Sequence, residues 1–159
     1  MRLVVFSDSH GNFDALYTVV RRHPEADAFV HLGDGEKEMG EIVRVFPEKI
    51  FYCVCGNCDS GSDAKSTEVL VLEGVRVFMT HGDMHSVKYD LLHLKHEARS
   101  RKAKLALFGH THIAHQEYDN QLYLLNPGSV SYPRVGNPTY GIADILPGGI
   151  ATSIMELKK

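Results

Sequence analysis

The sequence predicts an α/β (α+β) fold in which two packed sheets are flanked by helices. Two observations carry this prediction. Apolar runs of strand length alternate with amphipathic segments of helix length in the first half of the chain, and strands dominate the second half. The 159 residues suffice for one domain with its own core, so we expect a single domain over residues 1–159.

The first half of the chain alternates strands with helices. The expected strands are 3–6, 28–32 and 49–55, and the expected helices are 12–23 and 36–46. Pro24 and Pro47 follow the two helices and stop them. This alternation favours parallel pairing of the strands.

The second half reads mainly as strands, for which antiparallel additions are expected. Glu73 and Gly74 are a two-residue hairpin signal between strands expected at 68–72 and 75–80. A helix is expected over 87–102, and further strands at 104–108, 121–125, 141–146 and 150–155. Residues 126–140 read as a long loop.

Composition excludes several classes of protein. Hydrophobic residues make up 43% and charged residues 23% of the chain, as in ordinary globular proteins. The net charge of −3 argues against a broad nucleic-acid-binding face. Residues 1–6 run into polar sequence at Ser7 without a signal-peptide core, so we expect a cytoplasmic protein with no membrane partner. The apolar late strands could support a homo-oligomer.

Three cysteines cluster at Cys53, Cys55 and Cys58. A thiolate metal site is one interpretation, but the fourth thiolate of such a site is missing. The other interpretation is that these cysteines act as small hydrophobic residues near a strand.

Polar side chains follow five of the expected strands. These residues are Asp8, His10, Asp34, Asn57, His81, His110 and His112. Loops after successive strands of an α/β sheet meet at its carboxyl edge, so the seven side chains can converge on one cleft. Each one alone could be an ordinary turn or surface residue. Their occurrence at every one of these strand ends favours a common site, and oxygen and nitrogen donors of this kind suit Mn²⁺, Fe, Zn²⁺ or Ni²⁺.

In order and spacing, this series resembles the calcineurin-like metallophosphoesterases. The resemblance rests on the motifs Asp8-x-His10, Gly33-Asp34, Gly56-Asn57, His81 and Gly109-His110-x-His112. The short chain, Gly56-Asn57-Cys58-Asp59 and Asn126-Pro127-Gly128-Ser129 are similar to the small YfcE/MJ0936-type phosphodiesterase branch. The resemblance implies a metallophosphoesterase fold, a four-layer α-β-β-α sandwich of two mixed sheets.

The resemblance also implies a binuclear metal site, with manganese as the first choice and nickel, iron or zinc as alternatives. One ion would be held by Asp8, His10, Asp34 and His112, and the other by Asp34, Asn57, His81 and His110. Asp34 would bridge the ions, and catalytic roles would fall to Asp34, Asn57 and His81. The expected reaction is hydrolysis of a small phosphodiester by a metal-bridging hydroxide.

Cys58 departs from the wider family, many members of which have histidine directly after the motif asparagine. A thiol is a poor proton donor to an alkoxide, so we expect efficient turnover only with activated leaving groups. An alternative function is a protein-interaction scaffold that keeps the metal pocket but has little or no catalysis, like the retromer scaffold subunit. The complete set of seven ligands favours the enzyme.

Other polar residues have two open interpretations. Asn12 could contact phosphate or cap the helix that follows it. Asn126, Gly128 and Ser129 could bring polar groups to the cleft or form a purely structural turn. His31 and His85 could hydrogen-bond the groups that hold the ligands.

Overall fold

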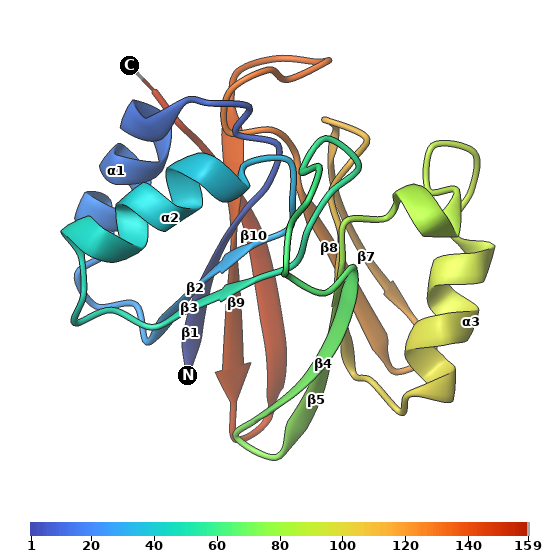
Figure 1. Ribbon diagram of the computed structural model, residues 1–159. Helices are drawn as coiled ribbons and strands as arrows, with labels where there is room; N and C mark the ends of the chain where they lie inside the picture. The colour runs from blue at the N-terminus through green and yellow to red at the C-terminus, as the bar shows by residue number, and fades with distance from the viewer. Residues whose placement is uncertain (159) are drawn as a thin grey trace.

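The computed structural model describes residues 1–158 and confirms the two-sheet architecture (Figure 1). Within these residues each sheet has five strands. The first has the order β10-β9-β1-β2-β3, with β1 (Arg2–Phe6), β2 (Ala28–His31), β3 (Phe51–Cys53), β9 (Thr139–Leu146) and β10 (Gly149–Glu156). The second has the order β4-β5-β6-β8-β7, with β4 (Thr67–Leu72), β5 (Val75–Thr80), β6 (Leu105–Leu107), β7 (Ala114–Asp119) and β8 (Leu122–Pro127).

Both sheets are mixed, and this decides where the loops meet. β1, β2 and β3 are parallel neighbours in the first sheet, and β5, β6 and β8 are parallel neighbours in the second. The other pairings are antiparallel. The carboxyl ends of the parallel strands therefore share one edge of each sheet.

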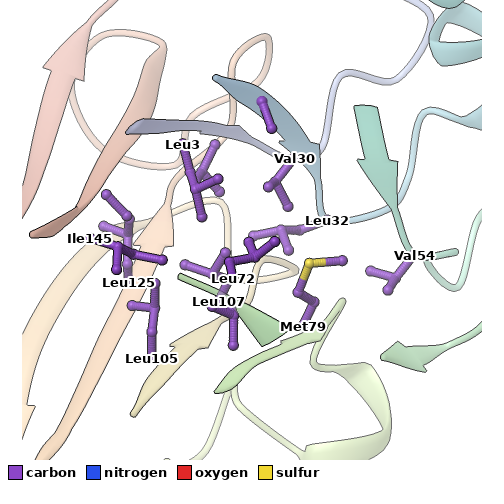
Figure 2. Packing of buried hydrophobic residues seen from close by; sticks show 14 residues of the cluster. Leu3, Val30, Leu32, Val54, Leu72, Met79, Leu105, Leu107, Leu125 and Ile145 are labelled. Carbon is purple, nitrogen blue, oxygen red and sulfur yellow. The ribbon is translucent and has the colours of Figure 1, made fainter. Parts of the chain in front are cut away.

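The main core lies between the sheets. Leu3 and Val30 of the first sheet face Met79 and Leu107 of the second, and all four side chains are fully buried (Figure 2). Complete burial of one such side chain contributes about 1.5–3 kcal/mol. This core fixes the two sheets, and hence their loops, relative to each other.

Helices cover the two outer faces, which completes the α-β-β-α order (Figure 1). α1 (Phe13–Arg22) and α2 (Glu36–Val45) pack on the first sheet, where they share a buried cluster with Phe6 and Phe29. α3 (Leu92–Ser100) packs on the second sheet. A 3₁₀ turn, η1 (Asp83–His85), follows β5. Within residues 1–158, no helix has the length and apolar character that crossing a membrane requires.

Two expectations for the second half were wrong in detail. The helix expected from residue 87 begins at Leu92, after the N-cap Leu91, because residues 86–89 form turns instead; the Leu92 amide donates a hydrogen bond to Asp90 Oδ1 (2.8 Å). β7 (Ala114–Asp119) was not expected at all. It is a polar edge strand that pairs with β8 on one side only, so it lacks the apolar alternation of a half-buried strand.

Candidate metal centre

The structure brings the seven predicted side chains together at the carboxyl edges of the parallel strands. Asp8 and His10 follow β1, Asp34 follows β2 and Asn57 follows β3. In the second sheet, His81 follows β5, whereas His110 and His112 follow β6. The site therefore spans the seam between the two sheets.

One group of donor atoms consists of Asp8, His10 and His112. The Nε2 atom of His112 lies 3.1 Å from Asp8 Oδ1 and 3.2 Å from His10 Nε2. Bond lengths of about 2.0–2.2 Å to a metal separate adjacent ligand atoms by about 3.0–3.4 Å. Two of the three distances therefore match adjacent ligands of one ion, and the third, from Asp8 Oδ1 to His10 Nε2, is 3.9 Å.

A second group consists of Asn57, His81 and His110. The Nε2 atom of His81 lies 3.1 Å from Asn57 Oδ1 and 3.1 Å from His110 Nδ1. Asp34 lies between the groups, because its Oδ2 is 3.4 Å from His81 Nε2 and 3.9 Å from His10 Nε2. The geometry thus places a single carboxylate within reach of both sets.

Hydrogen bonds orient the imidazoles so that their lone pairs face the centre. The Nδ1 atoms of His81 and His112 lie 2.7 Å from the backbone oxygens of Leu32 and Tyr132. A carbonyl oxygen only accepts, so each Nδ1 carries the proton. In the neutral rings, both Nε2 atoms then point a lone pair at other acceptors, an arrangement that requires a cation or an added proton.

Asp8 supplies the clearest test of whether these residues fit a metal. Its Oδ2 accepts hydrogen bonds from Ser7 Oγ (2.6 Å) and from the His110 amide (3.1 Å). Its Oδ1 is fully buried and has no hydrogen-bond partner, although the unprotonated His112 Nε2 is nearby. A buried charged oxygen without a partner is costly, so this atom fits a metal ligand.

The charges of the site agree with this view. Burial raises the pKa of the Asp8 carboxyl, but His112 and His81 in their protonated forms, together with Ser7, outweigh burial, so the pKa lies below its ordinary value. For His81, burial lowers the pKa, but the Asp34 and Asp8 carboxylates raise it by more, so the pKa lies above its ordinary value. A proton on the His81 ring thus supplies the positive charge that a metal cation would supply at the same position.

The backbone is strained at five of the seven residues. Asp8, His10, Asp34, His110 and His112 all have a positive φ, between 44° and 68°. Each such residue costs about 1–3 kcal/mol unless its surroundings hold it. Backbone hydrogen bonds from Asp8 to Gly33 and from His10 to Asp34, both 3.0 Å, supply part of this support.

Two glycines are required because other groups approach them closely. A Cβ atom on Gly56 would lie 2.2 Å from Asp34 Oδ1, and one on Gly109 would lie 2.0 Å from Ser7 Oγ. Both contacts are far shorter than any Cβ contact in a protein. The expected turns at these residues therefore serve to bring the ligand loops together.

Sequence reasoning missed the role of Asp59. Its carboxylate accepts four backbone hydrogen bonds, from Asp34 (2.7 Å), Gly35 (2.9 Å), Glu36 (3.0 Å) and Gly56 (2.8 Å). It thus caps α2, whose N-cap Gly35 has no side chain to do so, and ties the β2 and β3 loops together. A glycine before a helix was the signal that an acid elsewhere supplies the cap.

His31 links two ligand loops by hydrogen bonds, which is the supporting role that the sequence suggested for it. It is fully buried, and its Nδ1 accepts a hydrogen bond from the Gly33 amide (3.0 Å). Its Nε2 lies 2.9 Å from Ser9 Oγ, which donates to Glu38 (2.6 Å). Burial lowers the pKa of His31 to about 4, so this ring is neutral. His85 is buried beside Thr80, the residue before His81.

The turn at residues 126–129, at the end of β8, holds two ligand loops, and Asn12 caps a helix. Asn126 Nδ2 donates to the Gly109 oxygen (2.9 Å), and Ser129 Oγ donates to the Asp8 oxygen (2.7 Å), so the turn holds the backbone of two ligand loops. Asn12 caps α1 by accepting a hydrogen bond from the Ala15 amide (3.1 Å).

Cys58 lies at the exposed rim of the centre. Its amide donates to Asp34 Oδ1 (2.8 Å), and its Sγ lies within 4.8 Å of donor atoms of His10 and Asp34. Burial, followed by Asp34, raises the pKa of the Cys58 thiol. Cys53 is exposed, so the expectation that it packs as a small hydrophobic residue was wrong, because β3 is an edge strand and turns this side chain outward.

Comparison with known proteins identifies the family. The profile of the calcineurin-like phosphoesterase superfamily domain matches residues 1–147. The chain belongs to this superfamily. It is a phosphoesterase by family, and membership implies divalent metal ions. In Bacillus subtilis, the probable metallophosphoesterase YsnB is 36% identical over 136 residues, which cover 85% of this chain and 78% of YsnB. The phosphodiesterase YfcE of Escherichia coli K12 is 29% identical over 169 residues, with 91% of this chain and 88% of YfcE covered.

Solved structures support the same fold. A predicted phosphoesterase from Streptococcus pneumoniae superposes with a TM-score of 0.80 at 24% identity, covering 97% of each chain. Vps29 of Entamoeba histolytica, crystallised with Zn²⁺, superposes with a TM-score of 0.76 at 20% identity, covering 99% of this chain and 100% of Vps29.

Proposed function

We propose that this protein is a binuclear metal-dependent phosphodiesterase acting on small phosphodiesters. Asp8, His10, Asp34 and His112 would hold one divalent ion, and Asp34, Asn57, His81 and His110 the other. The buried, unpartnered Asp8 Oδ1 is the observation that carries the proposal. Residues 1–159 would act as one domain, since ligands come from the loops of both sheets.

When bound, two such ions would supply a water of lowered pKa and neutralise charge on the phosphoryl oxygens. The chain's own residues would orient these groups: His81 and His112 through their bonds to Leu32 and Tyr132, and Asp34 through the Cys58 amide. Two divalent ions, two aspartates and a hydroxide leave one positive charge. A monoanionic diester neutralises it, which favours diesters over dianionic monoesters.

The donor set supports manganese, with nickel, iron or zinc as alternatives. Imidazole nitrogens make up four of the seven predicted ligands, whereas Ca²⁺ and Mg²⁺ prefer oxygen ligands. The name of YfcE supports diester hydrolysis, because it describes a phosphodiesterase related over most of this chain.

The test is hydrolysis of bis-p-nitrophenyl phosphate and of p-nitrophenyl phosphate, after chelation and with each metal restored. We expect diester hydrolysis only with restored metal, largest with Mn²⁺, and its loss in Asp34→Asn. Asp63→Asn, an exposed acid in the loop after β3, is the control. If metal binds but neither ester is hydrolysed with any ion, the scaffold alternative, which the likeness to Vps29 supports, replaces the enzyme.

A further inference from the structure

A groove of about 540 Å³ opens beside the candidate metal centre. One side comes from residues 87–91 before α3, another from the segment between Phe108 and His115, and the third from Arg134 in the loop before β9. Small-molecule sites commonly have about 300–1,000 Å³. A larger hollow of about 770 Å³ opens at the opposite end of the strands, beside Met1 and Lys104, away from the ligands.

Each side of the groove is connected to a ligand loop. Thr111 lines the groove and lies between His110 and His112 in the chain. The Arg134 amide donates a hydrogen bond to the His112 oxygen (3.1 Å). Val87 packs on Gly82, the residue after His81, so closely that a Cβ there would lie 2.8 Å from Val87 Cγ2. The walls of the groove therefore belong to the same loops that carry His81, His110 and His112.

The walls of the groove are apolar. Val87 and Phe108 are buried beneath it, Leu91 is half-buried, and Ile113 is exposed. Tyr89 at its rim is 91% exposed, which leaves the ring free to cover a ligand. Apolar walls with an exposed aromatic rim favour a flat, aromatic group over a polar one.

Two cations border the groove. Lys88 and Arg134 both line it, and neither forms an ion pair with any residue of the described range 1–158. One carboxylate, Asp90, also lines the groove, and its Oδ1 is bonded to the Leu92 amide. The balance of charge is positive.

We infer that this groove binds an aromatic ester group that carries a second negative charge. The preferred substrate is then a phosphodiester with one anionic aryl ester group, whose ring lies between the apolar walls and whose anion pairs with Lys88 and Arg134. This inference rests on the proposed function and extends it from phosphodiesters in general to one class.

The test compares p-carboxyphenyl p-nitrophenyl phosphate with phenyl p-nitrophenyl phosphate in metal-restored protein. In Lys88→Met and in Arg134→Met, the ratio of kcat/KM for the carboxylated over the unsubstituted diester should fall about fivefold, as for the loss of a solvent-accessible ion pair. Arg44→Met, an exposed cation on α2, is the control and should keep the wild-type ratio.

Equilibrium binding of p-carboxyphenyl phosphonate by calorimetry gives a readout that does not depend on turnover. Its Kd should rise about fivefold in both groove variants and stay unchanged in Arg44→Met. If hydrolysis continues but both ratios match the wild type, the groove inference is overturned and the proposed function stands. If the wild type hydrolyses neither diester, the proposed function fails, and equal phosphonate Kd values in all four proteins would overturn the inference independently.

Discussion

The carboxylate of Asp59 holds the backbone of Asp34 from outside the metal centre. Asp59 Oδ2 accepts hydrogen bonds from the Asp34 amide (2.7 Å) and from the Gly56 amide (2.8 Å). A single side chain thereby joins the β2 loop to the β3 loop, which carry two of the predicted ligands.

Asp59→Asn should weaken metal binding about 10–100-fold, as loss of a group that orients a ligand does. The amide would turn its NH₂ group toward two of the four backbone donors, so stability should fall by about 1–3 kcal/mol. Metal titration and urea unfolding measure the two effects. Asp63→Asn, in the same loop, should change neither. Unchanged metal affinity in Asp59→Asn would show that the Asp34 loop keeps its position without this carboxylate.

A pair of glycine substitutions tests the close approach at the site. Gly56→Ala should lose metal binding, because its Cβ would lie 2.2 Å from Asp34 Oδ1 and must displace that carboxylate. Gly40→Ala has open space around its Cβ within α2 and should raise stability by about 0.5–1 kcal/mol. Circular dichroism melts and metal titration separate these effects. Wild-type metal affinity in a folded Gly56→Ala protein would contradict the packing described for this loop.

The neutral, buried His31 makes stability depend on pH. Its folded-state pKa of about 4 lies below the value of 6.5 expected for an exposed histidine, so the unfolded chain binds more protons between these values. The stability that this group contributes is complete above pH 6.5 and is lost as the pH falls toward 4. The full effect is about 3 kcal/mol.

His31→Gln removes this titration and keeps an amide near Gly33 and Ser9. Urea unfolding of the metal-free protein at several pH values should show a shallower loss of stability between pH 6.5 and 4 in the variant. The relevant quantity is the difference in slope, since other histidines titrate in both proteins. Parallel curves would mean that His31 is not held neutral by the fold.

Cys58 occupies the rim position from which a proton donor could serve the leaving group. Cys58→His should raise the ratio of alkyl to aryl diester hydrolysis, because a positioned general acid contributes about 10²–10⁴-fold and matters most for poor leaving groups. Steady-state kinetics on two diesters that differ only in the leaving group, methanol or p-nitrophenol, measure this ratio. Cys53→His, exposed on β3, should leave the ratio unchanged. No rise in Cys58→His would refute the role of a missing acid.

Much of the architecture was readable from the sequence because its signals are local. Apolar runs and the turn at Glu73 and Gly74 gave the strands, and the order of strands placed all seven site residues at one edge. β7 escaped prediction because an edge strand that faces solvent needs no apolar alternation. The start of α3 at Leu92 escaped prediction because the apolar pattern continues through residues 87–91, whereas residues 86–89 form turns.

The finer properties of the site depend on contacts that the sequence does not encode locally. Asp59 acts on amides 25 residues away in the chain, and Ser129 acts on Asp8 across 121 residues. The positive φ angles of Asp8 and His110 are imposed by such contacts, since neither residue type requires this conformation. The glycines next to the predicted ligands indicated that other groups approach the backbone closely, but they did not indicate which side chain does so.

The central claim is that two divalent ions share Asp34. The most direct measurement is the number of ions bound per chain, by metal analysis after chelation, reloading with Mn²⁺ and desalting. The wild type should retain two ions, His112→Ala one, and Asp34→Asn neither at the same metal concentration. An Asp34→Asn protein that is folded and still binds one ion with wild-type affinity would contradict the claim, because Asp34 would then belong to one site only.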